Sequence, residues 1–384
     1  MHVAYICADP GVPAFGHKGS SVHVQAVLRS LLRRGARVEL LAARLDGSPP
    51  PGLEDLRVHP LPRPPKGDAA ARERAALAAN AQLGDRLREL GDLDLVYERC
   101  SLWSHAALEA GAPSVLEVNA PLVDEQERHR VLVDRAGAER VADRQAAAAS
   151  AIVAVSAGVA DHLCARHPAA AARVHVLANG VDPERFPPGP ARSSAAPFTV
   201  GFVGTLKPWH GLAVLAEAFA RLRAAGPRAR LLVVGDGPER PALEAALLRL
   251  GVRHAATLTG AVAPAAVPRL MAEMDVAVAP YPPLEPFYFS PLKVVEALAA
   301  GLPVVASRLG RLADLVRDGG TGLLVPPGDP DALAAALARL AADPEWRRRL
   351  GRAGRAEVLE HHTWDAVVAR MLDLVAPARL VEAA

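Results

Sequence analysis

A lysine and a glutamate lie three residues apart in the segment Ser290-Pro-Leu-Lys-Val-Val-Glu296. Ser290 suits the N-cap of a helix and Pro291 suits its first turn, so the spacing places Lys293 and Glu296 on one helix face. The free N–H groups of a helix N-terminus attract anions, and Lys293 adds a full positive charge there. A cation for phosphates beside a carboxylate for hydroxyl groups suits a sugar nucleotide. The alternative is an ordinary surface helix with an exposed ion pair.

The neighbouring residues predict where this helix lies. The apolar run 276–280 indicates a buried strand before it, Gly301 and Pro303 end it, and the run 304–306 indicates the next strand. In such a strand–loop–helix–strand unit the helix N-terminus lies at the carboxyl edge of a parallel sheet, where ligands bind.

A second loop with cationic side chains is Gly204-Thr-Leu-Lys-Pro-Trp-His-Gly211. It lies between a predicted strand, 199–204, and a predicted helix, 212–225. Lys207 and His210 could both face an anion bound at that position. An ordinary strand-to-helix turn is the alternative, although turn chemistry explains the glycine and proline better than the lysine, tryptophan and histidine.

The first half of the chain offers weaker signals. The loop 16–21, Gly-His-Lys-Gly-Ser-Ser, precedes a helix that Ser20 or Ser21 can cap, but it lacks the G-x-G-x-x-G pattern of a dinucleotide site. Glu98 and the pair Glu117 and Asn119 follow predicted strands and should emerge at the carboxyl edge. A buried network of Glu98 with Arg99 is the alternative.

No metal site is indicated. Asp92-Leu-Asp94 has the D-x-D form found in metal-dependent sugar transferases, but it opens an apolar strand and is interpreted as a turn. The chain contains neither H-E-x-x-H nor C-x-x-C.

The length of 384 residues predicts two domains. A net charge of +2 argues against a protein that binds nucleic acid through a basic surface. The three cysteines are far apart and indicate reduced thiols in the cytoplasm. The N-terminus is typical of a first strand rather than a signal peptide, and no apolar run approaches a membrane span.

Strand-like runs alternate with helical patterns, which predicts α/β architecture with parallel sheets. Residues 183–198 contain five prolines and indicate the domain boundary. We therefore expect Rossmann-like domains over 1–190 and 191–363, facing each other across a cleft, and a helix in 364–384 that packs back on the first domain.

Five segments occur in an order that resembles the family 4 glycosyltransferases, which are retaining enzymes of the GT-B fold. They are the loop with Gly16 and Gly19, the segments 176–182, 201–211 and 234–238, and the stretch 285–301. Two departures stand out. Thr205 occupies the position of the family's usual arginine. The family's E-x7-E would place its first carboxylate at Tyr288, so the stretch resembles an S-P-x-K-x-x-E variant in which Glu285 is a candidate for the sugar contact.

The resemblance implies a role for each site residue. The second domain would bind a nucleotide diphosphate-sugar, with Glu296 on the ribose, and the first domain would bind the hydroxyl acceptor. The implied catalytic residues are Lys207, His210, Lys293 and Glu285. The implied donor-binding residues are Gly204, Asp236, Gly237, Gly260, Val262, Ser290, Pro291, Leu292 and Glu296. The implied acceptor-side residues are Gly16, Lys18, Gly19, Ser20, Glu98, Glu117 and Asn119.

The implied activity is retaining, metal-independent transfer of a sugar, with no further cofactor, to a hydroxyl acceptor such as a small natural product or a cyclitol. No protein nucleophile is required, because lysines and a helix N-terminus would stabilise the departing diphosphate. The alternatives are a nucleotide-sugar epimerase-hydrolase, a lipid- or polysaccharide-directed transferase of the family, and a sugar-nucleotide sensor without turnover.

Overall fold

The computed structural model describes residues 1–16, 18–65, 67–190, 196–226, 228–283 and 292–376. The chain forms two compact units: unit 1 is Met1–Asn179 with Trp364–Ala384, and unit 2 is Gly180–Thr363. The division therefore falls eleven residues before the position 190 expected from the prolines, at the Asn-Gly pair that follows the last strand of unit 1.

Unit 1 contains a seven-stranded parallel sheet in the order β3-β2-β1-β4-β5-β6-β7. In chain order the strands are β1 (His2–Cys7), β2 (Arg37–Ala42), β3 (Arg57–Pro60), β4 (Leu95–Arg99), β5 (Ser114–Val118), β6 (Ala151–Ala154) and β7 (Val174–Val176). Because successive side chains alternate between faces, the register aligns Ile6, Glu98, Leu116 and Ile152 on one face of the sheet.

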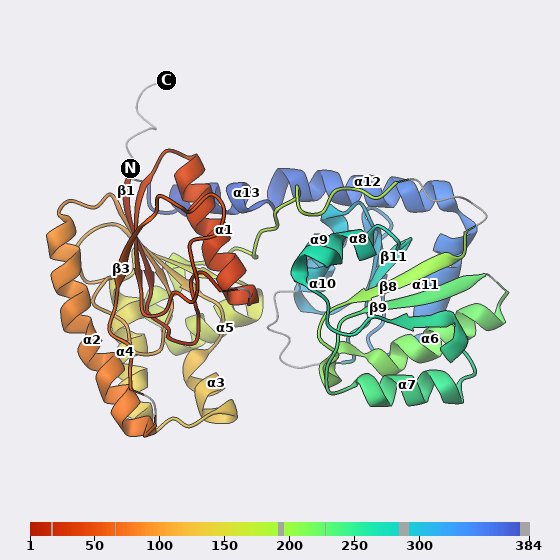
Figure 1. The fold of residues 1–384 in the computed structure, drawn as a ribbon, viewed down its shortest axis with the longest axis horizontal. Coiled ribbons are helices and arrows are strands. Elements are labelled where there is room, and N and C mark those ends of the chain that lie inside the picture. The colour runs from red at the N-terminus through yellow and green to blue at the C-terminus, as the bar shows by residue number, and fades with distance from the viewer. Residues whose placement is uncertain (17, 66, 191–195, 227, 284–291, 377–384) are drawn as a thin grey trace. The chain divides into compact units, whose positions relative to one another are not determined.

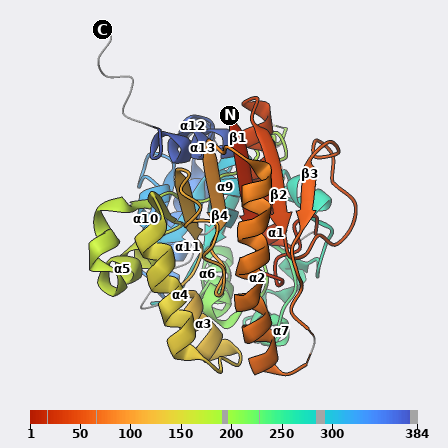
Figure 2. The ribbon, with the colours of Figure 1, turned by 90° about the vertical axis from the view of Figure 1, so that its left-hand side faces the viewer.

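Helices cover both faces of this sheet (Figures 1 and 2). On one face α2 (Ala69–Leu90) packs its buried leucines against Ile6 and Val96, and α4 (Arg135–Ala148) lies on the same side. On the other face α1 (Gly19–Arg33) and α13 (Trp364–Asp373) share a core with Tyr5 and Tyr97. Unit 1 is thus a three-layer α/β/α structure.

The last helix joins unit 1 although the chain reaches it only after passing through unit 2. The Trp364 indole meets the edge of the His23 ring at 4.6 Å between centroids. Asp365 accepts hydrogen bonds from the Ser30 hydroxyl at 2.6 Å and from the Arg33 guanidinium at 2.8 Å. Apolar burial and these bonds together hold α13 on α1.

Unit 2 contains a six-stranded parallel sheet in the order β10-β9-β8-β11-β12-β13. Its strands are β8 (Phe198–Val203), β9 (Ala229–Val234), β10 (Ala256–Leu258), β11 (Val276–Ala279), β12 (Val304–Ser307) and β13 (Gly322–Val325). Its α-helices are α6 (Leu212–Ala224), α7 (Arg240–Arg249), α8 (Val267–Met271), α9 (Leu292–Ala299), α10 (Gly310–Leu315), α11 (Pro330–Ala342) and α12 (Pro344–His361). Two apolar clusters, centred on Phe219 and on Leu298, cover the two faces.

Some elements differ from the expectations. Residues 46–67 are rich in proline and glycine, which predicts a connection without regular structure, but they contain the short edge strand β3. The polar segment after Pro121 forms α3 (Leu122–His129). Helix α5 (Ala157–Arg166) was not predicted from its short apolar pattern. Helix α1 begins at Gly19 with Lys18 as its N-cap, so neither Ser20 nor Ser21 is the cap.

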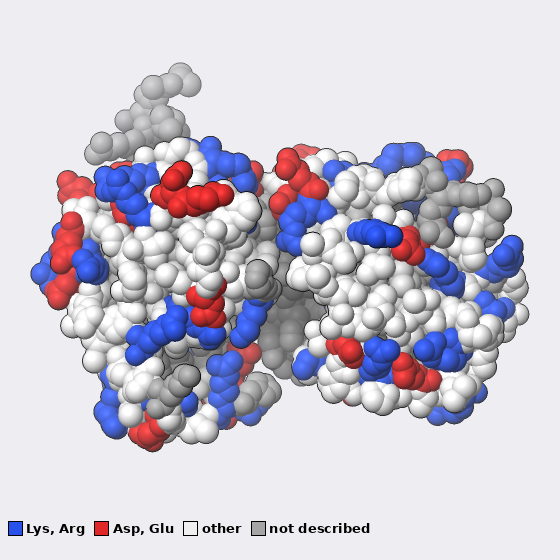
Figure 3. All heavy atoms as spheres, viewed as in Figure 1, with Lys and Arg blue, Asp and Glu red and all other residues white. Residues whose placement is uncertain are grey.

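The charge distribution agrees with the small net charge. On the face that Figure 3 displays, Lys and Arg side chains are interspersed with Asp and Glu side chains. Within the described part of the chain, none of the helices combines the length and the apolar character that a membrane span requires.

Candidate functional site

Two loops of unit 2 pack against each other at the carboxyl ends of neighbouring strands. Gly204 follows β8 with φ +143°, and Gly235 follows β9 with φ +138°. A Cβ at Gly235 would overlap the carbonyl of Gly204, so the contact requires glycine. The backbone N–H of Leu206 donates to the carbonyl of Asp236 at 2.9 Å. The close packing leaves backbone rather than side chains at this edge, where a ligand can approach closely.

Lys293 projects into this edge from the first turn of α9. Its Nζ lies 4.5 Å from the ring centroid of Phe202 in β8 and 5.1 Å from that of Tyr281, just after β11. A Cβ at Gly204 would lie 3.4 Å from the same Nζ. The Nζ atom is buried and has no hydrogen-bond partner in the described structure. An ammonium held only by aromatic faces, with its own donors unused, is suited to an anion.

Burial lowers the pKa of Lys293 to about 7, against the opposing effect of the Glu296 carboxylate. Desolvation penalises the charged form of an amine, and the nearby carboxylate only partly offsets the penalty. A bound anion would favour the protonated lysine, so anion binding and protonation at this side chain are coupled.

His210 lies beside Lys293 in the same aromatic cluster. Its ring is 5.8 Å from that of Phe202 and 5.5 Å from that of Tyr281, centroid to centroid. Its Nδ1 is 2.6 Å from the carbonyl oxygen of Thr205. Because a carbonyl only accepts, Nδ1 carries the proton and Nε2 presents a lone pair when the ring is neutral.

Burial, Lys293 and Lys207 together lower the pKa of His210 to about 4, which the Thr205 carbonyl opposes. The imidazole is therefore neutral near pH 7. The sequence predicted that His210 could face an anion, and with this pKa it would do so as a neutral ring that hydrogen-bonds.

Lys207 is half-buried in this loop and lies beside Trp209, which is exposed. Lys207 precedes the short 3₁₀ turn Pro208–His210, and its Nζ lies 5.7 Å from the centroid of the Trp209 indole. Trp209 is 37% exposed, which is unusual for so large an apolar side chain. The loop therefore presents a cation and an aromatic surface to solvent.

The adjoining loop brings the predicted donor-binding residues Asp236, Gly237 and Gly260 together. Asp236 accepts a 2.8 Å hydrogen bond from the backbone N–H of Gly237 and pairs with Arg240 at 3.5 Å. Gly235 forms an isolated bridge with Gly260, and Arg240 lies over Gly260. Val262, two residues on, instead packs its side chain against the apolar cluster around Leu298.

Glu296 lies one turn beyond Lys293 on α9. Burial raises the pKa of Glu296 to about 7, while Arg185 and Lys293 act in the opposite direction. Leu292 is the first residue of α9 as described. The predicted contacts at Glu285, Ser290 and Pro291 lie outside the described residues, and so does Tyr288.

In unit 1 the loop before α1 is held by Gln25. Its Nε2 donates to the carbonyls of Ala14 at 3.0 Å and Gly16 at 2.9 Å. Lys18 and Gly19 are exposed, and Ser20 is half-buried at the start of α1. These predicted acceptor-side residues remain accessible at the carboxyl edge of β1.

Glu117, also predicted on the acceptor side, is fully buried at the centre of a polar network. Its carboxylate accepts from His23 Nε2 at 2.9 Å, from Arg99 at 2.9 Å, and from Tyr97 and Asn119. Although burial alone would raise the pKa of Glu117, His23, Arg99 and Tyr97 hold that pKa far below its usual range. Glu117 can therefore orient Arg99 and Asn119 but offers no free surface of its own.

The network expected between Glu98 and Arg99 is absent from the described structure. Neighbouring residues of a strand point to opposite faces, so Arg99 reaches Glu117 while Glu98 faces α2. Glu98 has no accessible surface, and among the described residues neither carboxylate oxygen has a partner with good hydrogen-bond geometry, although the Ser104 hydroxyl lies near enough to oppose the effect of burial on the pKa. Burial raises the pKa of Glu98 to about 7.

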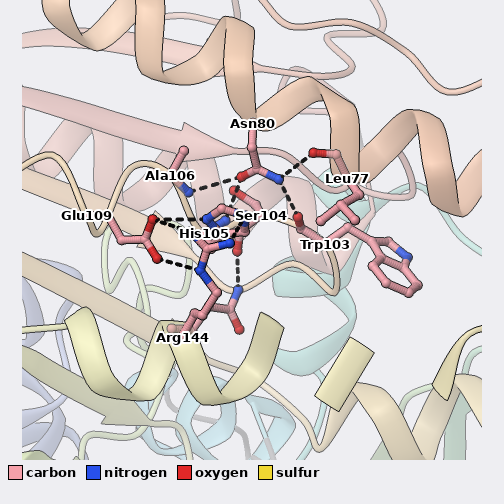
Figure 4. A network of polar contacts seen from close by, with 9 residues as sticks. Leu77, Asn80, Trp103, Ser104, His105, Ala106, Glu109 and Arg144 are labelled. Atoms are coloured by element: carbon pink, nitrogen blue, oxygen red, sulfur yellow. Dashed lines mark hydrogen bonds and ion pairs between the residues drawn. The ribbon is translucent and has the colours of Figure 1, made fainter. Parts of the chain in front are cut away.

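A further network holds the loop after β4, and sequence reasoning missed it (Figure 4). The Asn80 side chain donates to the carbonyl of Trp103 and accepts from the backbone N–H groups of His105 and Ala106, at 2.8–3.0 Å. Arg144 donates to His105 Nε2 at 3.0 Å and pairs with Glu109. His105 Nδ1 lies 3.3 Å from the Glu109 carboxylate, so both ring nitrogens have partners and the histidine is structural rather than catalytic.

The D-x-D residues lie at the opposite edge of the sheet. The Asp94 carboxylate accepts a 2.7 Å hydrogen bond from the backbone N–H of His2, at the amino ends of β1 and β4. Among the described residues, no group of three or more His, Cys, Asp or Glu side chains is arranged to hold a metal ion.

Comparisons with known proteins place this arrangement in one family. Residues 17–185 match the model described as glycosyltransferase family 4, and residues 197–343 match that described as glycosyl transferases group 1. A D-inositol 3-phosphate glycosyltransferase of Stackebrandtia nassauensis is 30% identical over 95% of this chain and 87% of its own length. The chain belongs to glycosyltransferase family 4.

Solved structures share the fold along nearly the whole chain. A sucrose-phosphate synthase from Thermosynechococcus elongatus superposes with a TM-score of 0.69 at 22% identity, covering 97% of this chain and 98% of that one. Anabaena HepE in complex with UDP and glucose gives 0.66 at 23% identity, with the same coverage. The fold is therefore the two-domain α/β fold of the GT-B class, as expected from the sequence.

Proposed function

We propose that this glycosyltransferase moves a sugar from a nucleotide diphosphate-sugar to a hydroxyl group, with retention of configuration and without a metal ion. The observation that supports the donor site is Lys293, whose buried Nζ lies beside the backbone of Gly204 and has no hydrogen-bond partner among the described residues. Lys207, His210 and the N-terminal turn of α9 add the donors and dipole that a diphosphate needs. Anabaena HepE, which shares the fold, was crystallised with UDP, and this supports a diphosphate nucleoside as the donor's leaving group.

In this proposal the reaction requires no protein nucleophile. As the bond between the sugar and the diphosphate breaks, negative charge grows on the phosphate oxygen, and the ammonium groups of Lys207 and Lys293 stabilise it. The departing phosphate takes the proton of the incoming hydroxyl on the same face of the sugar. Glu296 binds the ribose hydroxyls, and the loop residues Gly16, Lys18, Gly19 and Ser20 with Asn119 bind the acceptor.

For the acceptor we propose a cyclitol or a similarly small polyol. Two relatives named for D-inositol 3-phosphate match almost the full chain, which supports this class over a long polymer. Glu117 would contribute by fixing Arg99 and Asn119, whose side chains it holds.

A donor and acceptor screen tests the proposal. UDP-, GDP-, ADP- and TDP-sugars are compared by thermal shift, because a ligand that binds only the folded protein raises the melting temperature. The best donor is then incubated with myo-inositol or inositol phosphate, and the product's anomeric configuration is determined by NMR. An inverted product would refute retention. Rapid nucleotide release without acceptor would instead support the epimerase-hydrolase alternative.

A further inference from the structure

Unit 1 contains a pocket that none of the predicted donor or acceptor residues lines. It has a volume of about 200 Å³ and lies between α4 and α5, over strands β5 and β6. Its floor is Leu116, Val118 and Ile152, and Leu163 of α5 forms one wall. These apolar side chains lie on the sheet face opposite the Glu117 network, because Leu116 and Glu117 alternate along β5.

The pocket exists because α4 places small side chains over the sheet. Ala142 and Ala146, one turn apart on α4, line it where a leucine would fill the space. Protein interiors are normally close-packed, and an unfilled apolar hollow costs stability in proportion to its volume. About 200 Å³ exceeds the roughly 150 Å³ apolar cavity that holds a benzene molecule.

Charged groups surround the pocket, but they neutralise one another. Arg135 pairs with Glu139 at 3.0 Å and with Asp124 at 3.2 Å, and Arg166 pairs with Glu139 at 3.2 Å. The two arginines and two carboxylates that line the pocket therefore balance. Burial lowers the pKa of His167, which keeps that imidazole neutral near pH 7. A charged ligand would have to break one of these ion pairs to gain a partner.

The inner end of the pocket provides few hydrogen-bond partners for a water molecule. Gln145 donates to the carbonyls of Ser101 at 2.9 Å and Ser104, and its oxygen faces the Cys100 thiol at 3.7 Å. Ordered water in a protein interior typically needs two to four polar partners. Because the amide of Gln145 is already engaged, the apolar floor is better covered by an apolar molecule than by water.

We propose that this pocket is a second small-molecule site, which binds one uncharged, largely apolar molecule the size of a single ring of about six to nine carbon atoms. The ring of the bound molecule covers Leu116 and Ile152 on the floor of the pocket. If the molecule carries a single hydroxyl, that group lies toward the charged rim. The site is distinct from the donor site in unit 2.

The test uses the full-length protein and two probe molecules of similar size and shape that differ in charge. Benzyl alcohol is uncharged, whereas benzoate carries a full negative charge. We expect saturable binding of benzyl alcohol by calorimetry with a matching rise in melting temperature, and binding of benzoate at least tenfold weaker. Equal binding of the two probes, or no saturable binding of benzyl alcohol, would refute the proposed ligand class.

Variants locate the binding. Ala142→Leu fills the pocket and should weaken benzyl alcohol binding at least tenfold without lowering the melting temperature. Ala147→Leu adds the same atoms on the exposed side of α4 and should leave binding unchanged. Ala146→Val, a smaller filling, replaces Ala142→Leu if that variant does not fold. Undiminished binding in a folded pocket-filled variant would place the probe elsewhere and overturn the assignment.

Discussion

The ring nitrogen Nδ1 of His210 lies 2.6 Å from the carbonyl oxygen of Thr205, five residues earlier in the same loop. This hydrogen bond fixes the tautomer, and the two flanking lysines with burial keep the ring neutral. By the family resemblance Thr205 would stand at the position of the usual arginine, and here its backbone carbonyl meets a neutral imidazole. Positive charge at this edge comes from Lys207 and Lys293.

The first prediction separates the two nitrogens of His210. His210→Asn can retain a donor to Thr205 while removing Nε2, whereas His210→Ala removes both. We expect His210→Asn to keep the wild-type melting temperature and His210→Ala to lower it by the equivalent of about 1 kcal/mol, the usual net value of one hydrogen bond. Both should slow transfer less than Lys293→Met, because neither removes a positive charge. Steady-state kinetics and thermal unfolding measure the two effects. A rate loss in His210→Asn as large as that in Lys293→Met would show that the ring is charged during the reaction.

The second prediction concerns pH and Lys293, whose pKa is about 7. The protonated amine binds the diphosphate, so donor affinity should be full below pH 7 and should fall above it, by up to about tenfold per pH unit. The ionisation of Glu296, whose pKa is also about 7, acts in the same direction by adding negative charge. A nucleotide sugar is the suitable ligand, because both ends of its diphosphate are esterified.

Lys293→Arg supplies the control for this prediction, since a guanidinium stays charged throughout. Its donor affinity, measured by calorimetry from pH 6 to 9, should depend less on pH than that of the wild type. The residual dependence should disappear in Lys293→Arg combined with Glu296→Gln. A wild-type affinity that does not vary over this range would contradict the assignment of Lys293 to the diphosphate.

The third prediction is a stability effect of Glu98. Burial raises the pKa of Glu98 from 4.5 to about 7. Between these values the unfolded chain is ionised while the folded protein keeps the proton, so the free energy of unfolding falls as pH rises, by about 1.4 kcal/mol per unit. Below pH 4.5 the ionisation of Glu98 does not reduce the free energy of unfolding. Above pH 7 the reduction is complete, and its upper limit is about 3 kcal/mol.

Glu98→Gln removes this titration and tests it. The free energy of unfolding of the variant, minus that of the wild type, should increase by up to about 3 kcal/mol from pH 4.5 to pH 8. Urea unfolding at both pH values measures this difference. Glu125→Gln, at an exposed position on α3, should show no such gain. If the difference between Glu98→Gln and the wild type does not change with pH, Glu98 is solvated or paired in solution.

The positions of strands and loops could be predicted from the sequence, because apolar runs and glycine, proline and cap residues are local signals. The predicted strand 199–204 is found at Phe198–Val203, and the predicted helix 212–225 is found at Leu212–Ala224. The proximity of Lys293 to Gly204 also follows from topology, since both lie at the carboxyl edge of one parallel sheet.

The environment of the predicted acceptor-side carboxylates could not be predicted in this way. Glu117 is buried by His23 and Tyr97, and Met371 of α13 contacts Tyr97, so its partners come from distant parts of the chain. The local segment Glu117-Val-Asn119 therefore does not indicate which residues surround Glu117. The network of Asn80 with the loop after β4 likewise depends on how α2 packs, which a pattern of single residues does not specify.

The fourth prediction is metal independence. The described residues hold no cluster suited to a metal ion, and two lysines occupy the proposed diphosphate site. Excess EDTA should therefore leave transfer within about twofold of the untreated rate. A complete loss that Mg²⁺ or Mn²⁺ restores would contradict the proposed mechanism, and would require a metal bound with the nucleotide, since Asp94 lies at the amino edge of the sheet of unit 1 and the proposed diphosphate site is in unit 2.

The last prediction separates Lys293 from Glu296 on the same helix. Lys293 lies in the first turn of α9 with its Nζ beside Gly204, whereas Glu296 lies one turn deeper, near Arg185. If Lys293 meets the phosphates, it acts where charge develops, and Lys293→Met should lower kcat by about 10²–10³, or about 2.7–4 kcal/mol, by analogy with loss of one oxyanion donor. If Glu296 meets the ribose, its contact is equal in the ground and transition states.

Glu296→Gln should therefore raise the donor's KM and leave kcat nearly unchanged, which is the signature of uniform binding. Glutamine keeps one acceptor for the ribose hydroxyls, so Glu296→Ala should raise KM further. Both constants are measured for all three variants at saturating acceptor, with donor Kd determined separately because KM equals Kd only when chemistry is slow. If Glu296→Gln loses turnover while its donor Kd is unchanged, Glu296 acts on the transferred sugar, and the ribose must be bound by other groups at this edge.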